Sequence, residues 1–269
     1  TYDIEDYVSN LVVSDTGSAD AIVQGKDLTA RNTADAAEAK TIESRKGTTG
    51  ELHYNVSDTF AQLTNGDNSA GVNSATNVTV SQSDGVTTSQ AETVIALTNS
   101  GLTTISNIAG NVSEINTFLG KADNQENDKL SYSYYVSDSW AKVNTAISEP
   151  NLAFIKGASV DGVTAASVAS QITLNGTVSA ENAETFWQAV SGVFTGITDN
   201  APTVASRTTY HVAETDVTIL NDTVAARDSI KDATTITISD TADAFYKAQT
   251  GQTTNNDDIF ALINTRDNG

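Results

Sequence analysis

The phrase Tyr54-Asn-Val-Ser-Asp-Thr-Phe-Ala-Gln-Leu63 returns 80 positions later as Tyr134-Tyr-Val-Ser-Asp-Ser-Trp-Ala-Lys-Val143. Another phrase, Asp84-Gly-Val-Thr87, returns 77 positions later as Asp161-Gly-Val-Thr164, and Tyr210 follows Tyr134 by 76 positions. Phrases of different sequence therefore recur at nearly the same spacing. Within each long period we expect about three strand-then-helix units of roughly 25 residues, a length found in solenoid repeats.

The repeated phrase predicts a strand that leads into a capped helix. Tyr54 and Val56 are two positions apart and share one face of a strand. Ser57 or Asp58 is expected to accept hydrogen bonds from the first N–H groups of the following helix. Phe60 and Leu63 lie three positions apart, so one helix face carries both and packs on the strands. Residues 134–143 are expected to fold in the same way.

Other segments follow the same order of strand then helix, with different residues. Strands are predicted at 78–80 and 102–108, and a helix at 33–47, where acidic residues come first and Arg45 and Lys46 last. A capping box is expected at Ser89 to Glu92, and a further helix from Ser113 that stops at Gly120. Polar runs at 65–77 and 123–129 predict surface loops. Looser copies of the phrase lie at 2–6, 12–16 and 236–245.

The order of V-S-D-T-x-A-x-L, V-T-V, A-L-T-N-S-G and L-T-T-I-S-N-I resembles the S-D-T-A-A-N-L type repeats of very large secreted bacterial proteins. Residues 52–143 carry this resemblance best. Similar repeats occur in S-layer-like proteins and RTX-type adhesins, so the resemblance implies a secreted surface protein. The chain has no Gly-Gly pair, and the calcium-binding nonapeptide of RTX blocks is therefore missing.

The expected fold class is α/β, with tandem strand-helix repeats stacked as an elongated solenoid-like array; the alternative is a series of small β-rich domains. Proline occurs only at Pro150 and Pro202, and we expect boundaries near them. The predicted segments are an amino-terminal strand-helix segment at 1–50 and three repeat blocks at 51–150, 151–202 and 203–269.

The composition limits which binding partners and which cellular location are expected. The chain has 34 acidic and 14 basic residues, a formal net charge of -20, which disfavours nucleic acid and anionic membranes. Cysteine is absent, which excludes disulfides, thiolate metal sites and cysteine nucleophiles. No apolar run is long enough to span a bilayer. We expect an exported acidic protein whose partners are copies of itself or neighbouring repeats of a longer chain.

Residues with catalytic or metal-binding chemistry are few. His53 and His211 each adjoin the tyrosine of a predicted strand and are expected on the strand surface, since no G-x-S-x-G elbow or phosphate-binding glycine motif is present. Asp123, Glu126 and Asp128 share one loop and are the candidate metal ligands, because calcium prefers hard oxygen ligands on flexible loops. The alternative for this cluster is solvated acidic surface.

These observations predict an extracellular structural protein and not an enzyme. The expected role is a self-associating segment of a surface layer, filament or giant adhesin, with calcium as the candidate cofactor. The alternative is a display module of an adhesin or phage fibre that binds a ligand or receptor through exposed loops.

Overall fold

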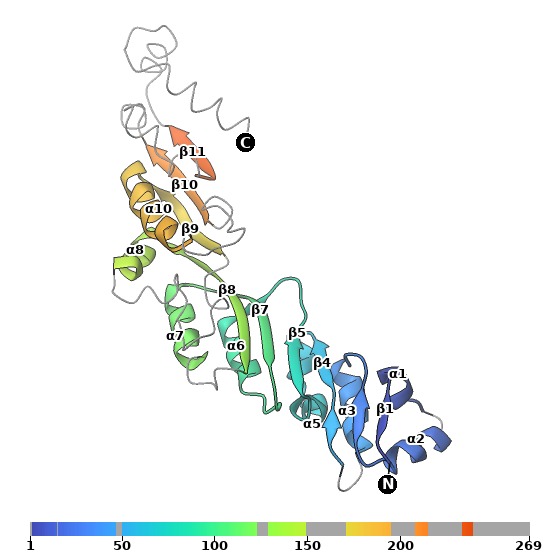
Figure 1. Cartoon of the computed structure of the whole chain (residues 1–269). Helices are drawn as coiled ribbons and strands as arrows, with labels where there is room; N and C mark the ends of the chain where they lie inside the picture. The colour runs from blue at the N-terminus through green and yellow to red at the C-terminus, as the bar shows by residue number, and fades with distance from the viewer. Residues whose placement is uncertain are drawn as a thin grey trace, which may run out of the picture. The chain divides into compact units, whose positions relative to one another are not determined.

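The computed structural model describes residues 2–14, 16–46, 50–122, 129–148, 171–194, 208–214 and 233–238. The chain divides into two compact lobes, an amino-terminal lobe of residues 1–134 with 157–168 and a carboxyl-terminal lobe of 135–156 with 169–269. Strands and helices alternate in both lobes, and the described strand pairs are parallel (Figure 1). The predicted α/β class is confirmed.

The amino-terminal lobe holds short strands and helices joined by turns. Its strands are β1 (Ile4–Asp6), β2 (Leu28–Ala30), β3 (Leu52–His53), β4 (Asn55–Asp58), β5 (Asn77–Val80), β6 (Val86–Thr87), β7 (Thr103–Gly110) and the first half of β8 (Leu130–Ser139). Its helices are α1 (Val8–Leu11), α2 (Thr16–Val23), α3 (Ala36–Ser44), α4 (Phe60–Leu63), α5 (Ser69–Asn73), α6 (Thr88–Ile95) and α7 (Val112–Ala122), with a 3-10 turn, η1 (Gly66–Asn68). The strands predicted at 78–80 and 102–108 correspond to β5 and β7.

Most of the described strands pair with strands close to them in sequence. One sheet has the order β1-β2-β3, and β4, β5, β7 and β8 follow one another in a second sheet, with β6 beside β7. Opposite residues are 24 positions apart between β1 and β2, 22 between β4 and β5, and 25 between β5 and β7. The predicted unit of roughly 25 residues is thus confirmed in this lobe.

Alternating burial shows which face of the strands packs against the helices. Val56, Val78 and Ile105 are fully buried, while their neighbours along the strands are at least partly exposed. In the amino-terminal lobe, the parallel connections from β1 to β2, β4 to β5 and β5 to β7 contain helices, and crossovers of one hand between successive strands place such helices on the same face. Leu63 and Val94 of these helices are fully buried as well.

The carboxyl-terminal lobe contains units of unequal length. It contains the second half of β8, α8 (Trp140–Ser148), β9 (Gln171–Val178), α10 (Ala180–Phe194), β10 (Thr208–Glu214) and β11 (Thr235–Ile238). Opposite residues are 36 positions apart from β8 to β9 and 24 from β10 to β11. The rings of Trp140 and Phe186 meet edge to face at 6.4 Å, so helix-face aromatic residues pack in this core.

The polar run at 65–77 is not the surface loop that its composition predicts. It forms η1 and α5, and Val72 and Ala75 are fully buried. Gly71 lies directly against the backbone of α3, where a Cβ atom would stand 2.3 Å from the Lys40 nitrogen. The run therefore folds because a glycine permits close approach of two helices and two small apolar side chains fill the space beneath them.

Helix starts differ from the prediction in two places. The capping box of α6 joins Thr87 and Gln90, in place of the expected box at Ser89 to Glu92. Asn111 and Glu114 exchange hydrogen bonds at the start of α7, which continues through Gly120 to Ala122. The predicted helix at 33–47 is confirmed as α3, with a capping box formed by Asp35 and Glu38.

The looser copy predicted at 12–16 is not a strand, because Val12 caps the end of α1 and Thr16 begins α2. The copy at 2–6 does contain β1, and the one at 236–245 overlaps β11. Pro150 and Pro202 lie outside the described residues, so the boundaries expected near them stay predictions. Within the described part of the chain, none of the helices is both long enough and apolar enough to traverse a lipid bilayer.

Candidate functional site

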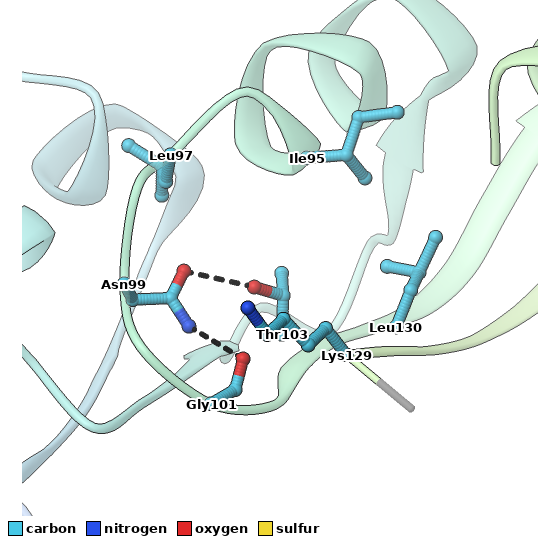
Figure 2. A pocket seen from close by; sticks show the side chains of 7 residues that line it. All are labelled: Ile95, Leu97, Asn99, Gly101, Thr103, Lys129 and Leu130. Atoms are coloured by element: carbon cyan, nitrogen blue, oxygen red, sulfur yellow. Dashed lines mark hydrogen bonds between the residues drawn. The ribbon is translucent and has the colours of Figure 1, made fainter. Parts of the chain in front are cut away.

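The described part of the chain contains a hollow between α6 and the start of β8 (Figure 2). Its volume is about 50 Å³, whereas pockets that hold small molecules measure roughly 300–1,000 Å³. Its lining residues are Ile95, Leu97, Asn99, Gly101, Thr103, Lys129 and Leu130.

The buried amide in this hollow serves the turn that surrounds it. The Asn99 amide nitrogen donates to the Gly101 carbonyl at 3.0 Å, and the Thr103 hydroxyl donates to the Asn99 amide oxygen at 3.0 Å. Figure 2 shows both bonds closing the turn between α6 and β7. We conclude that Asn99 stabilises the connection and is not aimed at a ligand.

The predicted metal ligands Asp123, Glu126 and Asp128 lie outside the described residues. Within the parts of the chain that are described, no three His, Asp or Glu side chains come together as a metal site would require. The candidate calcium loop therefore remains a prediction from the sequence.

Both histidines lie on strands, as expected. The His53 Nε2 atom is 3.6 Å from a carboxylate oxygen of Glu51, and both side chains are exposed. The His211 Nδ1 atom is 2.6 Å from the Thr235 hydroxyl on the neighbouring strand. Neither histidine has a serine hydroxyl as a hydrogen-bond partner in the described part of the chain, so the geometry of a hydrolytic triad is not assembled there.

The repeated aspartate stands in one local geometry at three places. Asp6, Asp58 and Asp138 each lie at or next to the end of a strand, and the Oδ1 atom of each accepts a hydrogen bond of 2.7 Å from the next backbone N–H. In each case a helix begins two residues after the aspartate, at Val8, Phe60 or Trp140.

The prediction that Ser57 or Asp58 caps the following helix is wrong, because Asp58 caps a different helix. Thr59 is the N-cap residue of α4 and makes no side-chain capping bond. The second carboxylate oxygen of Asp58, Oδ2, instead accepts a 3.1 Å hydrogen bond from Ala36, the first residue of α3 in the preceding unit. Asp58 therefore caps a helix 22 residues earlier in the chain, because strand register places it opposite that helix start.

Two further helices receive the same bond from the unit that follows them. The first N–H of α1, at Val8, donates to the Asn32 side chain at 2.8 Å. The first N–H of α4, at Phe60, donates to the Gln82 side chain at 3.1 Å. We call this contact the inter-unit cap: one unit supplies the side-chain acceptor and the previous unit supplies the first N–H of its helix.

Amide and carboxylate side chains also bridge the units at the other ends of the strands. Asn77 donates to the Asn55 side chain at 2.9 Å and accepts from the Leu102 backbone at 2.7 Å, so one residue joins three successive units. Asp27 accepts from the Glu51 backbone at 2.9 Å, and this bond, together with the nearby Lys26 ammonium, lowers the pKa of Asp27.

A further cap closes the carboxyl end of a helix. The guanidinium group of Arg45 donates to the carbonyl oxygens of Leu11 and Val13, at and beyond the end of α1. Arg45 was expected to complement the dipole of its own helix, yet its side chain reaches the helix of the preceding unit.

The strand face opposite the buried valines carries hydroxyl and amide groups. In the amino-terminal lobe, strand register sets Asn55 beside Asn77, and Ser57 beside Thr79 and Thr104. These five side chains are at least partly exposed, and none of them is charged although the chain has 34 acidic residues. The acids of this lobe are thus kept off the face of β4, β5 and the first part of β7.

Sequence reasoning missed the inter-unit acceptors Asn32, Asn77 and Gln82. The signal that would have identified them is the recurrence of polar residues 22 to 25 positions from a helix start or strand end, as the observed bonds show. Comparison of the chain with protein-family models, curated proteins and solved structures found no match.

Proposed function

We propose that the chain is a structural segment of a secreted bacterial surface protein, in which strand-helix units stack as a solenoid-like array and copies of the array associate. The observation that carries this proposal is the inter-unit cap, repeated at Val8, Ala36 and Phe60. A fold in which each unit satisfies the polar groups of the previous one can be extended by adding units. Such extension is what a surface layer, filament or giant adhesin requires.

The surface chemistry of the described residues also favours a structural role. Several of their polar side chains bond to the neighbouring unit, as Asp27, Asp58 and Asn77 do. The hollow beside Asn99 is too small for a ligand of ordinary size. An extracellular location fits a chain without cysteine and with a net charge of -20.

Association of copies is tested by sedimentation velocity over a range of protein concentrations. Because a charge of -20 opposes contact between copies, we expect association to strengthen with millimolar calcium and to weaken with a chelator. Magnesium at the same ionic strength controls for charge screening alone. A chain that stays monomeric at high concentration with and without calcium contradicts the proposal.

A variant of the candidate metal-binding loop tests the calcium part of the proposal. Asp123→Asn, Glu126→Gln and Asp128→Asn together remove the charge of the candidate loop while keeping side-chain size. We expect this triple variant to associate as the parent chain does in chelator and to lose the additional response to calcium. If it responds to calcium as the parent does, these residues are not the ligands.

A second candidate function rests on the uncharged strand face. A row of hydroxyl and amide groups that includes Asn55, Thr79 and Thr104 offers hydrogen bonds without charge, which suits a neutral polysaccharide. We would measure retention of the chain on neutral and on acidic polysaccharide gels, with Ser57→Glu and Thr79→Glu as variants. Retention on neutral gels that both variants abolish would favour the display module over the structural segment.

A further inference from the structure

Side-chain bonds join the units of the amino-terminal lobe at both ends of its strands, and the two ends differ in the direction of the bond. At the carboxyl ends, the inter-unit caps run from the first helix N–H of one unit to a side chain of the next, at Val8, Ala36 and Phe60. The earlier unit therefore supplies the backbone donor, and the later unit supplies the acceptor.

At the amino ends of the strands, the same kind of bond runs the other way. Glu51, directly before β3, donates its backbone N–H to Asp27, directly before β2, at 2.9 Å. Leu102, just before β7, donates its backbone N–H to Asn77, the first residue of β5, at 2.7 Å. Here the later unit supplies the backbone donor, and the earlier unit supplies the acceptor.

Strand register accounts for both sets of bonds. The helix-start bonds span 22 to 24 residues and the strand-start bonds span 24 or 25. Opposite residues of neighbouring strands in this lobe are likewise 22 to 25 positions apart. Because parallel strands run in one direction, helix starts gather at one end of the sheet and strand starts at the other.

Breaking a helix-start bond affects the unit of the donor more than the unit of the acceptor. The first N–H of a helix has no partner within its own helix, so it depends on the acceptor that the next unit supplies. Val8 and Ala36 are buried, and water does not readily replace an acceptor lost there. The acceptor Asn32 is exposed, so its side chain can bond to water instead.

The unit of β5 and α6 makes both kinds of bond, and β5 lies between β4 and β7 (Figure 1). Its Gln82 accepts from Phe60 at the start of α4, in the unit before it. Its Asn77 accepts from Leu102 at the start of β7, in the unit after it. One unit thus holds a helix start on one side and a strand start on the other.

We propose that these bonds couple the units of the amino-terminal lobe in two directions. A unit that opens locally leaves the helix start of the unit before it, and the strand start of the unit after it, without an acceptor. The coupling acts within a single chain, so it does not depend on the proposed association of copies.

Two variants of the unit of β5 and α6 separate the directions. Gln82→Ala removes the acceptor for Phe60, and Asn77→Ala removes the acceptor for Leu102. Amide hydrogen exchange of the full chain, followed residue by residue by NMR, reports how often each N–H opens. Circular dichroism checks that each variant is folded.

We expect each alanine variant to raise exchange on one side only. Gln82→Ala should raise the exchange rate of the Phe60 amide about twofold to tenfold, the effect of losing one neutral hydrogen bond, and should leave the Leu102 amide unchanged. Asn77→Ala should raise the exchange rate of the Leu102 amide by at least as much and leave the Phe60 amide unchanged.

Conservative variants control for the other bonds of the two side chains. The Gln82 amide nitrogen donates to the Gly85 carbonyl, and the Asn77 amide nitrogen donates to the Asn55 side chain. Gln82→Glu and Asn77→Asp lose these donors and keep an acceptor oxygen. We therefore expect the amides of Phe60 and Leu102 to exchange in these variants as they do in the parent chain.

Three results would overturn the inference. Exchange that rises only within the altered unit would show that its neighbours do not depend on these side chains. Exchange that rises equally on both sides in both alanine variants would show coupling without direction. If the conservative variants raise exchange as much as the alanine variants do, the acceptors do not carry the coupling. The proposed structural function stands in each case, because sedimentation tests it separately.

Discussion

Replacing Gly71 by alanine tests how closely neighbouring units must pack. Gly71 lies in α5, and an added Cβ atom would stand 2.3 Å from the Lys40 nitrogen, 2.4 Å from the Ala39 carbonyl carbon and 2.6 Å from the Ala39 oxygen. Ordinary Cβ contacts measure 3.4–4 Å, so the two helices must separate by about 1 Å. The contacted atoms are backbone, and no side chain can rotate away to relieve the overlap.

The expected cost follows from two opposing effects. Overpacking a well-packed core costs about 1–3 kcal/mol. Replacing glycine stiffens the unfolded chain and returns roughly 0.4–1 kcal/mol. Separation of the helices also strains the 2.5 Å hydrogen bond from the Tyr54 hydroxyl to the Gly71 carbonyl. We therefore expect a net loss of about 1–2 kcal/mol in the free energy of unfolding.

Gly66→Ala is the matched control, five positions away in the same run. A Cβ atom at Gly66 meets nothing within 4 Å, so this variant should be as stable as the parent or slightly more so. Urea unfolding followed by circular dichroism gives the free energies, and amide hydrogen exchange across residues 36–73 shows where stability is lost. Equal stability of the two variants would refute the close contact between α3 and α5.

Three other predictions concern polar groups. Asp58→Ala removes the acceptor for two backbone N–H groups and should cost about 1–3 kcal/mol, against about 0.5–2 kcal/mol for Asp138→Ala; unchanged urea midpoints would contradict the capping role. Tyr54→Phe leaves the Gly71 carbonyl without its donor and should cost about 1–3 kcal/mol in the same assay, whereas Tyr7→Phe, at an exposed position, should change stability by less than about 0.5 kcal/mol. Burial raises the pKa of the Tyr54 and Tyr134 phenols. The stability that their neutral forms contribute is therefore present below the ordinary pKa of about 10 and is lost as the pH rises above it. Tyrosinate absorbance from these two residues should appear together with unfolding, and its appearance in the folded protein would contradict their burial.

The strands and the best helix could be predicted because their signals are local. Val78 and Val80 alternate with polar residues and are buried as that alternation implies. Asp35 and Glu38, which form the capping box, are three positions apart, and this spacing is recognisable in the sequence alone. The same holds for β7, which covers all but the first residue of the strand predicted at 102–108.

The inter-unit contacts could not be predicted in this way, because their partners are set by strand register. Asp58 has the sequence position of a local cap, yet Thr59 is the N-cap residue of α4 and the Oδ2 atom of Asp58 bonds to the start of α3. The burial of Gly71 and Val72 could not be predicted for a different reason. They lie in a run rich in Asn and Ser, and the run reads as solvent-exposed until the packing of α5 on α3 is known.

The inter-unit cap also bears on how stability is distributed in the proposed stack. Each cap exchanges one bond with water for one bond with a neighbour and contributes about 0.5–3 kcal/mol, with the carboxylate of Asp58 at the upper end. Because α1, α3 and α4 each depend on the next unit for this bond, neighbouring units contribute directly to the stability of a stacked array. A unit at an open end has one neighbour instead of two and is the first to unfold.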